Sequence, residues 1–291
     1  MIEVNNLTKY YGDFPAIENI SFTVNKGEIL GFLGPNAAGK TTTMRVLTGF
    51  MPPTSGSAKI AGFDVVSQSL EVRRRIGYLP ETVPLYTEMN VKEYLDFMGS
   101  IRGMGKQWRR RRISDVIGIC RLEEYSSTLI GKLSKGFRQR VGIAQAILHE
   151  PEVLIMDEPT IGIDPIQVVE TRNLIKGLGG EHTLILSTHI LPEVSMVCER
   201  VIIINEGQVV AIDRPENLSE RLRGAERIEV DIRGPFAQVM TALRDIPGVQ
   251  EVIRVDRDDV GSYSIESTSG ADLTEQVSTL VFQKGWCLLR L

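Results

Sequence analysis

The fold is decided by residues 27–49, which read GEILGFLGPNAAGKTTTMRVLTG. Residues 27–34 form a short apolar run that ends in glycine, a pattern typical of a buried strand that stops at a turn. Residues 41–49 are expected to form a helix. Between them, residues 34–41 read GPNAAGKT and match G-x-x-x-x-G-K-[ST], the phosphate-binding loop that joins a strand to a helix. The segment therefore predicts a nucleotide phosphate site at the end of a buried strand.

The residue types in this loop suit a nucleotide. Successive backbone N–H groups can point at phosphate oxygens, and the N-terminus of the following helix adds a partial positive charge. Lys40 can reach the β- and γ-phosphates, and the hydroxyl of Thr41 can bind Mg²⁺. A simple glycine turn would need neither side chain at these positions. The candidate nucleotide-binding residues here are Gly34, Pro35, Asn36, Ala37, Ala38, Gly39, Lys40, Thr41 and Thr42.

Residues 153–158, VLIMDE, supply a second part of the same site. Four apolar residues predict a buried strand whose end presents Asp157 and Glu158. We expect Asp157 to hold Mg²⁺ and Glu158 to polarise the attacking water. Alone, this pattern would equally fit a strand end with solvated carboxylates, but together with the phosphate loop it favours hydrolysis.

The order of apolar runs predicts the architecture. Residues 153–157, 183–188 and 201–205 are short buried strands separated by helices, which is typical of a parallel sheet covered on both faces. Residues 88–148 are expected to be a helical insertion. The composition changes again at residues 223–225, and the order strand, helix, strand, strand, helix, strand follows. We therefore predict an α/β domain over 1–224 and a small α+β, ferredoxin-like domain over 225–291.

Composition excludes several classes of protein. The 291 residues carry a net charge of −4, so there is no global attraction to nucleic acid. Three well-separated cysteines favour a reducing compartment over a disulfide framework. The sequence shows no leader pattern and no apolar run of about 18 residues. We expect a cytoplasmic protein, so another chain must supply any membrane-spanning part.

Further motifs resemble those of the ATP-binding cassette (ABC) family. Residues 133–141, LSKGFRQRV, are similar to the family's LSGGQ signature, and residues 157–160 read its DEPT. Residues 163–165 resemble its D-loop, residues 187–189 its switch histidine, and Tyr11 the aromatic residue that stacks on adenine. The resemblance covers residues 2–222 and implies a phosphate-loop NTPase fold of the ABC ATPase type.

The resemblance also implies how the site is assembled. Two subunits would form a head-to-tail dimer, with ATP held between the phosphate loop of one and the signature residues Ser134, Lys135 and Gly136 of the other. A Ser at a helix start followed by Gly suits this role, because it offers a hydroxyl, backbone N–H groups and the helix dipole to a γ-phosphate. The remaining implied roles are γ-phosphate contact for His189, the D-loop for Asp164, and the Mg²⁺ site for Glu81. Glu158, His189 and Lys40 are the expected catalytic residues. The implied partners are a second, identical cassette and integral membrane permease subunits, which would place the chain on the inner face of the cell membrane.

Residues 77–81, 84–95 and 133–148 look like the ATPase subunits of type 2 ABC exporters, closest to a group associated with gliding motility. Three departures from the family pattern stand out: Ala37 replaces a glycine, Glu81 replaces a glutamine, and Lys135 and Phe137 replace signature residues. A left-handed backbone at Ala37 would store strain, and Ala37→Gly would then improve ATP affinity by up to roughly tenfold.

Two alternative functions belong to other classes. A soluble ABC ATPase acting on ribosomes or DNA would usually carry a second cassette or long insertions, and a nucleotide switch without turnover would not need Glu158. Two surface signals also stay open. Residues 108–112, WRRRR, are either a solvated helix face or an anion contact. The aromatic and apolar side chains of Leu85, Tyr86, Tyr94 and Phe97 belong either to the core of the insertion or to a surface that docks a membrane partner.

Overall fold

The computed structural model describes residues 1–218, 227–254, 261–267 and 273–291. The chain divides into two compact units, Met1–Pro215 and Glu216–Leu291, and each is described by itself. The domain boundary expected at 224/225 lies outside the described residues. None of the described helices is both long enough and apolar enough to cross a membrane.

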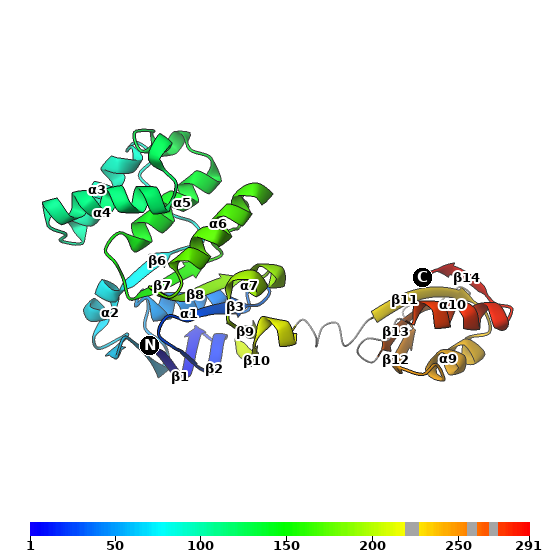
Figure 1. The fold of residues 1–291 in the computed structure, drawn as a ribbon. Helices are drawn as coiled ribbons and strands as arrows, with labels where there is room; N and C mark the ends of the chain where they lie inside the picture. Colours follow the sequence, from blue (N-terminus) through cyan, green and yellow to red (C-terminus); the bar gives the residue numbers. More distant parts are fainter. Residues whose placement is uncertain (219–226, 255–260, 268–272) are drawn as a thin grey trace. The chain divides into compact units, whose positions relative to one another are not determined.

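A six-stranded sheet forms the centre of the first unit, in the order β10-β9-β3-β8-β7-β6 (Figure 1). Strands β9, β3, β8, β7 and β6 run parallel, and β10 adds an antiparallel edge. Both faces are covered, so nearly every residue of β3, β7 and β8 is buried. The predicted parallel sheet is confirmed. The strands are β3 (Ile29–Leu33), β6 (Ile76–Leu79), β7 (Val153–Asp157), β8 (Thr183–Thr188), β9 (Arg200–Asn205) and β10 (Gln208–Asp213).

A second sheet, in the order β2-β1-β4-β5, is antiparallel. Helix α1 (Lys40–Leu47) contacts β7 on one side and β2 and β4 on the other. Its Met44, Val46 and Leu47 are fully buried in the core that joins the two sheets. This packing fixes the helix whose N-terminus follows the phosphate loop. The antiparallel strands are β1 (Ile2–Tyr11), β2 (Phe14–Val24), β4 (Ser55–Ile60) and β5 (Phe63–Asp64).

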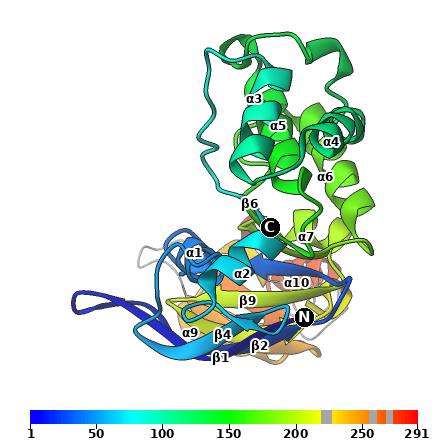
Figure 2. The ribbon, with the colours of Figure 1, turned by 90° about the vertical axis from the view of Figure 1, so that its left-hand side faces the viewer.

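The helices of residues 91–147 form a lobe that stands apart from the antiparallel sheet (Figure 2). Asn90 caps helix α3 in a reciprocal arrangement with Glu93, which fixes where that helix begins. The lobe contains α3 (Val91–Ile101), α4 (Lys106–Ile119), two short 3₁₀ turns and α5 (Lys135–Ile147). The remaining helices of the unit are α2 (Ser69–Arg75), α6 (Pro165–Leu178) and α7 (Leu191–Val197).

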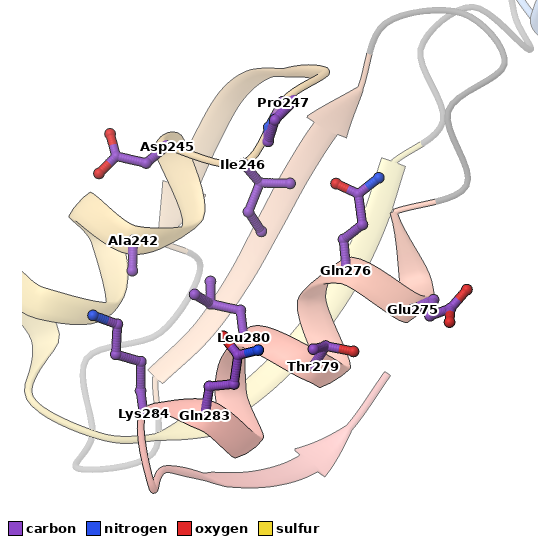
Figure 3. Close-up of a pocket in the computed structure, with 10 residues that line it drawn as sticks. All are labelled: Ala242, Asp245, Ile246, Pro247, Glu275, Gln276, Thr279, Leu280, Gln283 and Lys284. Atoms are coloured by element: carbon purple, nitrogen blue, oxygen red, sulfur yellow. The ribbon is translucent and has the colours of Figure 1, made fainter.

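The second unit has the element order and strand order of a ferredoxin-like fold. Its antiparallel sheet has the order β12-β13-β11-β14, and helices α9 and α10 supply Val239, Leu243, Val277 and Val281 to its core. The elements are β11 (Arg227–Arg233), α9 (Phe236–Arg244), β12 (Val249–Arg254), β13 (Gly261–Ser267), α10 (Thr274–Gln283) and β14 (Cys287–Arg290). A cavity of about 550 Å³ lies beside the two helices, with Ile246 and Leu280 pointing into it (Figure 3).

Candidate nucleotide site

The phosphate loop leaves β3 and closes on α1 through tightly packed backbone. A Cβ at Gly34 would overlap the carbonyl oxygen of Ile204, and a Cβ at Gly39 would lie 2.6 Å from the carbonyl oxygen of Ala16. Ala37 has φ +64°, in the left-handed region that favours glycine. The loop therefore has, at Ala37, the left-handed backbone for which the sequence analysis expects strain.

Lys40 and Glu158 meet beneath this loop. The Lys40 Nζ donates hydrogen bonds to the carbonyl oxygens of Gly34 at 2.6 Å and Pro35 at 3.0 Å, and it lies 3.4 Å from Glu158 Oε1. On the other side of the carboxylate, His189 Nδ1 lies 3.1 Å from Glu158 Oε2. The structure thus brings together the three residues that the sequence predicts to be catalytic.

Asp157, the last residue of β7, is fully buried. Its Oδ1 accepts a hydrogen bond from the Ser187 hydroxyl, whereas its Oδ2 has no partner among the described residues. A buried carboxylate oxygen without a donor is costly unless a cation or water satisfies it, so the site fits Mg²⁺. Ser187 also fixes the next residue, because its hydroxyl accepts from the backbone N–H of Glu158 at 3.0 Å.

A cavity of about 430 Å³ opens over the loop. Its lining includes loop residues 36–42, whereas Gly34 and Pro35 are not part of it. Tyr11, Glu81 and Glu158 complete it from β1, from the segment after β6 and from the residue that follows β7. The lining residues are Tyr11, Phe14, Ala16, Asn36, Ala37, Ala38, Gly39, Lys40, Thr41, Thr42, Glu81, Glu158 and Ile161. The structure places Asp157 and Ser187 next to this cavity through their contacts with Glu158.

Phe14, Ala16 and Ile161 are lining residues that the sequence reasoning missed. Tyr11 and Phe14 are paired across the turn between β1 and β2, and both are exposed. Two exposed aromatic residues on either side of Gly12-Asp13 were a usable signal, because such side chains offer flat apolar faces to a planar ring. The hairpin tip therefore presents two aromatic rings at the loop cavity.

The signature residues lie elsewhere in the unit. Ser134 is the N-cap of α5, where its hydroxyl accepts from the backbone N–H of Phe137 at 3.4 Å. Ser134 and Lys135 are exposed, whereas Gly136 is buried against the Gln167 side chain. Among the described residues, the lining of the loop cavity contains none of these three.

Asp164, the predicted D-loop residue, is the exposed N-cap of α6 and accepts from the Gln167 backbone N–H at 3.0 Å. Gln167 thereby connects two predicted motifs, since its side chain packs on Gly136 of the signature. The Lys135 ammonium also lies over Gly162 in the segment before Asp164. The chain therefore carries a cavity at the phosphate loop and, separately, a compact surface formed by the signature and D-loop residues.

A parallel sheet, a loop that ends in Lys-Thr and a carboxylate beside that lysine define a phosphate-loop ATPase. The comparisons with known proteins agree. Residues 17–161 match the family model described as ABC transporter. The linearmycin resistance ATP-binding protein LnrL of Bacillus subtilis (strain 168) is 33% identical over 255 residues, which cover 87% of this chain and 81% of the relative. The bacitracin transport ATP-binding protein BcrA of Bacillus licheniformis is 40% identical, with coverage of 77% and 72%.

A solved dimeric ATP-binding cassette, in a post-hydrolysis state with ADP and phosphate, has a similar fold. Its TM-score is 0.67 at 25% identity, and the match covers 74% of this chain and 99% of that one. The chain therefore belongs to the ABC transporter family. It is an ATP-binding and ATP-hydrolysing subunit, as the resemblance implied.

Proposed function

We propose that two copies of this chain close on ATP and thereby drive an exporter formed by separate membrane permease subunits. The observation that carries the proposal is the separation of Ser134 from Lys40: the exposed N-cap of α5 stands outside the cavity that contains the lysine. A helix N-terminus that is free of its own loop is available to the γ-phosphate held by another copy. The dimeric form of a similar solved cassette supports this arrangement.

The bound nucleotide would be held from both sides. Tyr11 and Phe14 would contact adenine, the phosphate loop and Lys40 would hold the phosphates, and Ser134 with its neighbours would come from the second copy. Mg²⁺ would be held by Thr41 and Asp157, with Glu81 orienting its water. When bound, the cation neutralises charge on the phosphates. Glu158 would accept the proton of the attacking water, and His189 would contact the γ-phosphate.

A groove on the surface of the first unit supports the proposal of a membrane partner. A groove of about 910 Å³ lies between α2 and the lobe of α3 and α4, and its wall includes Phe50, Leu70, Ile101 and Trp108, all well exposed. Exposed apolar side chains gathered in one groove are typical of a protein-binding site. Of the four residues left open by the sequence, Tyr94 is buried core, Leu85 is half-buried, and Tyr86 and Phe97 are partly exposed.

The groove also carries positive charge from Arg73, Arg74 and Arg102. Burial, followed by the charge of Arg102, lowers the pKa of His149 to about 4, so this histidine is neutral at physiological pH. A permease segment with apolar residues and a carboxylate would fit the groove. The exporter direction is supported by the relatives, which are named for resistance to linearmycin and transport of bacitracin. The chain would then work at the cytoplasmic face of the membrane.

One experiment tests both the partner and the groove. The tagged chain is expressed in its native cell, washed membranes are collected, and the proteins that co-purify in detergent are identified. We expect a polytopic permease, and we expect Phe50→Asp to detach the chain from membranes without lowering its soluble ATPase rate. Phe282→Asp is the matched control, because Phe282 is even more exposed, at 86% against 73%, and lies in the second unit. Recovery of ribosomes or DNA in place of a permease would overturn the proposal.

A further inference from the structure

Helix α7 carries a buried carboxylate that the roles assigned above do not use. Glu193 is only 8% exposed, and one of its oxygens, Oε2, accepts hydrogen bonds from Thr160 Oγ1 at 2.7 Å and Thr188 Oγ1 at 3.1 Å. Both hydroxyl groups are themselves buried. We infer that Glu193 is a positioning residue, which holds the segment of Glu158 and the segment of His189 at a fixed separation. The inference rests on the proposed roles of those two residues.

The two threonines lie close in sequence to Glu158 and His189. Thr160 lies two positions after Glu158, and Thr188 directly precedes His189. The Thr188 hydroxyl donates to Glu193 and also accepts from the backbone N–H of Ile190 at 3.2 Å. The backbone on both sides of His189 is therefore tied to the same carboxylate oxygen that holds Thr160.

This link is the outer of two connections between the ends of β7 and β8. The inner one is Ser187, which pairs with Asp157 in the sheet and accepts from the backbone N–H of Glu158. Ser187 holds the Asp157 carboxylate and the backbone N–H of Glu158, but not the residues after Glu158. Glu193 supplies the hydrogen bonds that join the segment just after Glu158, at Thr160, to the segment just after Ser187, at Thr188. His189 Nδ1 also contacts the Glu158 carboxylate directly, 3.1 Å from Oε2, and both connections support the geometry of that contact.

The position of α7 itself does not need the Glu193 carboxylate. Helix α7 lies against β3 and β8 (Figure 1), and Val194 is fully buried there. A Cβ at Gly31 would lie 2.9 Å from Val194 Cγ1, so the absence of a side chain at Gly31 allows this close packing. Removing the carboxylate should therefore leave the helix in place while two buried hydroxyl groups lose their shared acceptor. We expect the substitution to shift Glu158 and His189 relative to each other. Misplacement of a catalytic group by about 1 Å can lower the rate by a factor of about 10².

The first test compares Glu193→Ala with Glu193→Gln in the full chain. We expect Glu193→Ala to lower kcat roughly 10- to 100-fold, while the Kd for ATP stays within about twofold. Glu193→Gln keeps a carbonyl oxygen that can accept both hydroxyl groups, and it should restore kcat to within about threefold of the unchanged chain. The matched control is Glu28→Ala, a carboxylate 7% exposed that pairs with Arg200 where β3 begins, away from the loop. This control should lower Tm and leave kcat within about twofold.

A second test asks whether Glu193 acts through the two hydroxyl groups. Thr160→Val/Thr188→Val keeps the shape of both side chains and removes both donors. We expect this double variant to lose kcat as Glu193→Ala does, and adding Glu193→Ala to it should cost less than about threefold more. If the triple variant instead lost kcat by the product of the two separate losses, the inference would be overturned. Equal losses of kcat for Glu193→Ala and Glu28→Ala would also overturn it. A normal rate for Glu193→Ala beside a slow Glu158→Gln overturns only the positioning role, whereas a normal rate for Glu158→Gln overturns the proposed base.

Discussion

Lys40 and Glu158 form a buried ion pair, with Nζ 3.4 Å from Oε1 and both side chains 7% exposed. A phosphate that reaches Lys40 competes with Glu158 for the same ammonium group. Breaking such a pair in a buried site changes the environment of the remaining charge strongly. We therefore expect nucleotide binding to release the Glu158 carboxylate, which is then free to accept a proton from the attacking water.

Glu158→Gln should keep ATP binding and slow hydrolysis by a factor of about 10²–10⁴, because the amide cannot act as a base. The variant should also accumulate as an ATP-bound dimer, since the repulsion between carboxylate and γ-phosphate is gone. Phosphate release and light scattering with ATP check both outcomes. A variant that hydrolyses ATP normally and stays monomeric would show that another residue is the base.

Lys40→Ala should weaken ATP binding and turnover together, because the ammonium neutralises phosphate charge in both the ground state and the transition state. Loss of a buried charged partner costs about 2 kcal/mol or more, which corresponds to at least about a 30-fold loss of affinity. A titration with a non-hydrolysable ATP analogue measures this loss. Lys40→Ala also leaves Glu158 without its cation, so Lys40→Ala/Glu158→Gln should have a higher Tm than Lys40→Ala alone.

Ser134→Arg should leave ATP binding to the single subunit nearly intact and abolish dimer formation. The reason is the exposed position of Ser134 outside the loop cavity, where a long side chain would block only the partner's phosphates. Mixing it with Lys40→Ala should restore one working composite site per dimer, which an ATPase assay of the mixture detects. Failure of rescue in mixtures that do form dimers would mean that Ser134 does not act in trans.

The sequence predicted most of the fold because the deciding signals are local. The apolar runs of β3, β7, β8 and β9, and the element order of the second unit, follow from residues adjacent in the chain. The loop, Asp157 and Glu158 were predictable for the same reason. Their spacing along the chain already implies that the strands carrying them end at one edge of a parallel sheet.

The residues of the site that the sequence analysis missed are recognised only through tertiary contacts. Glu193 stands in a short amphipathic helix and looks like a solvated charge until α7 is packed against β3 and β8. Phe14 flanks the same turn as Tyr11, which was a signal in the sequence, but only the register of the hairpin shows that the two residues pair. The packing of Gln167 on Gly136 joins residues 31 positions apart, which no local pattern indicates. Sequence order therefore predicted which motifs the chain has, and packing determined what supports them.

The strain expected at Ala37 can be tested by ATP affinity, because the structure has the positive φ on which that strain depends. At φ +64°, alanine occupies a region that costs an L-residue about 1–2 kcal/mol. Glycine has no such cost but loses about 0.5–1 kcal/mol more in conformational entropy when the loop becomes ordered. The balance favours glycine by about 1 kcal/mol, provided that the phosphates hold the loop in this conformation.

Ala37→Gly should therefore bind ATP roughly fivefold more tightly, a factor that corresponds to about 1 kcal/mol. Ala38→Gly is the matched control, because Ala38 is the next residue, is 3% exposed and does not have a positive φ. At position 38 the substitution brings only the entropic cost and the loss of a methyl contact, so the affinity of Ala38→Gly for ATP should fall. Isothermal titration of both variants with the ATP analogue separates the two effects. If Ala37→Gly binds more weakly, as Ala38→Gly should, then the nucleotide-bound loop does not keep the left-handed backbone, and Ala37 instead pre-orders the loop at no cost in strain.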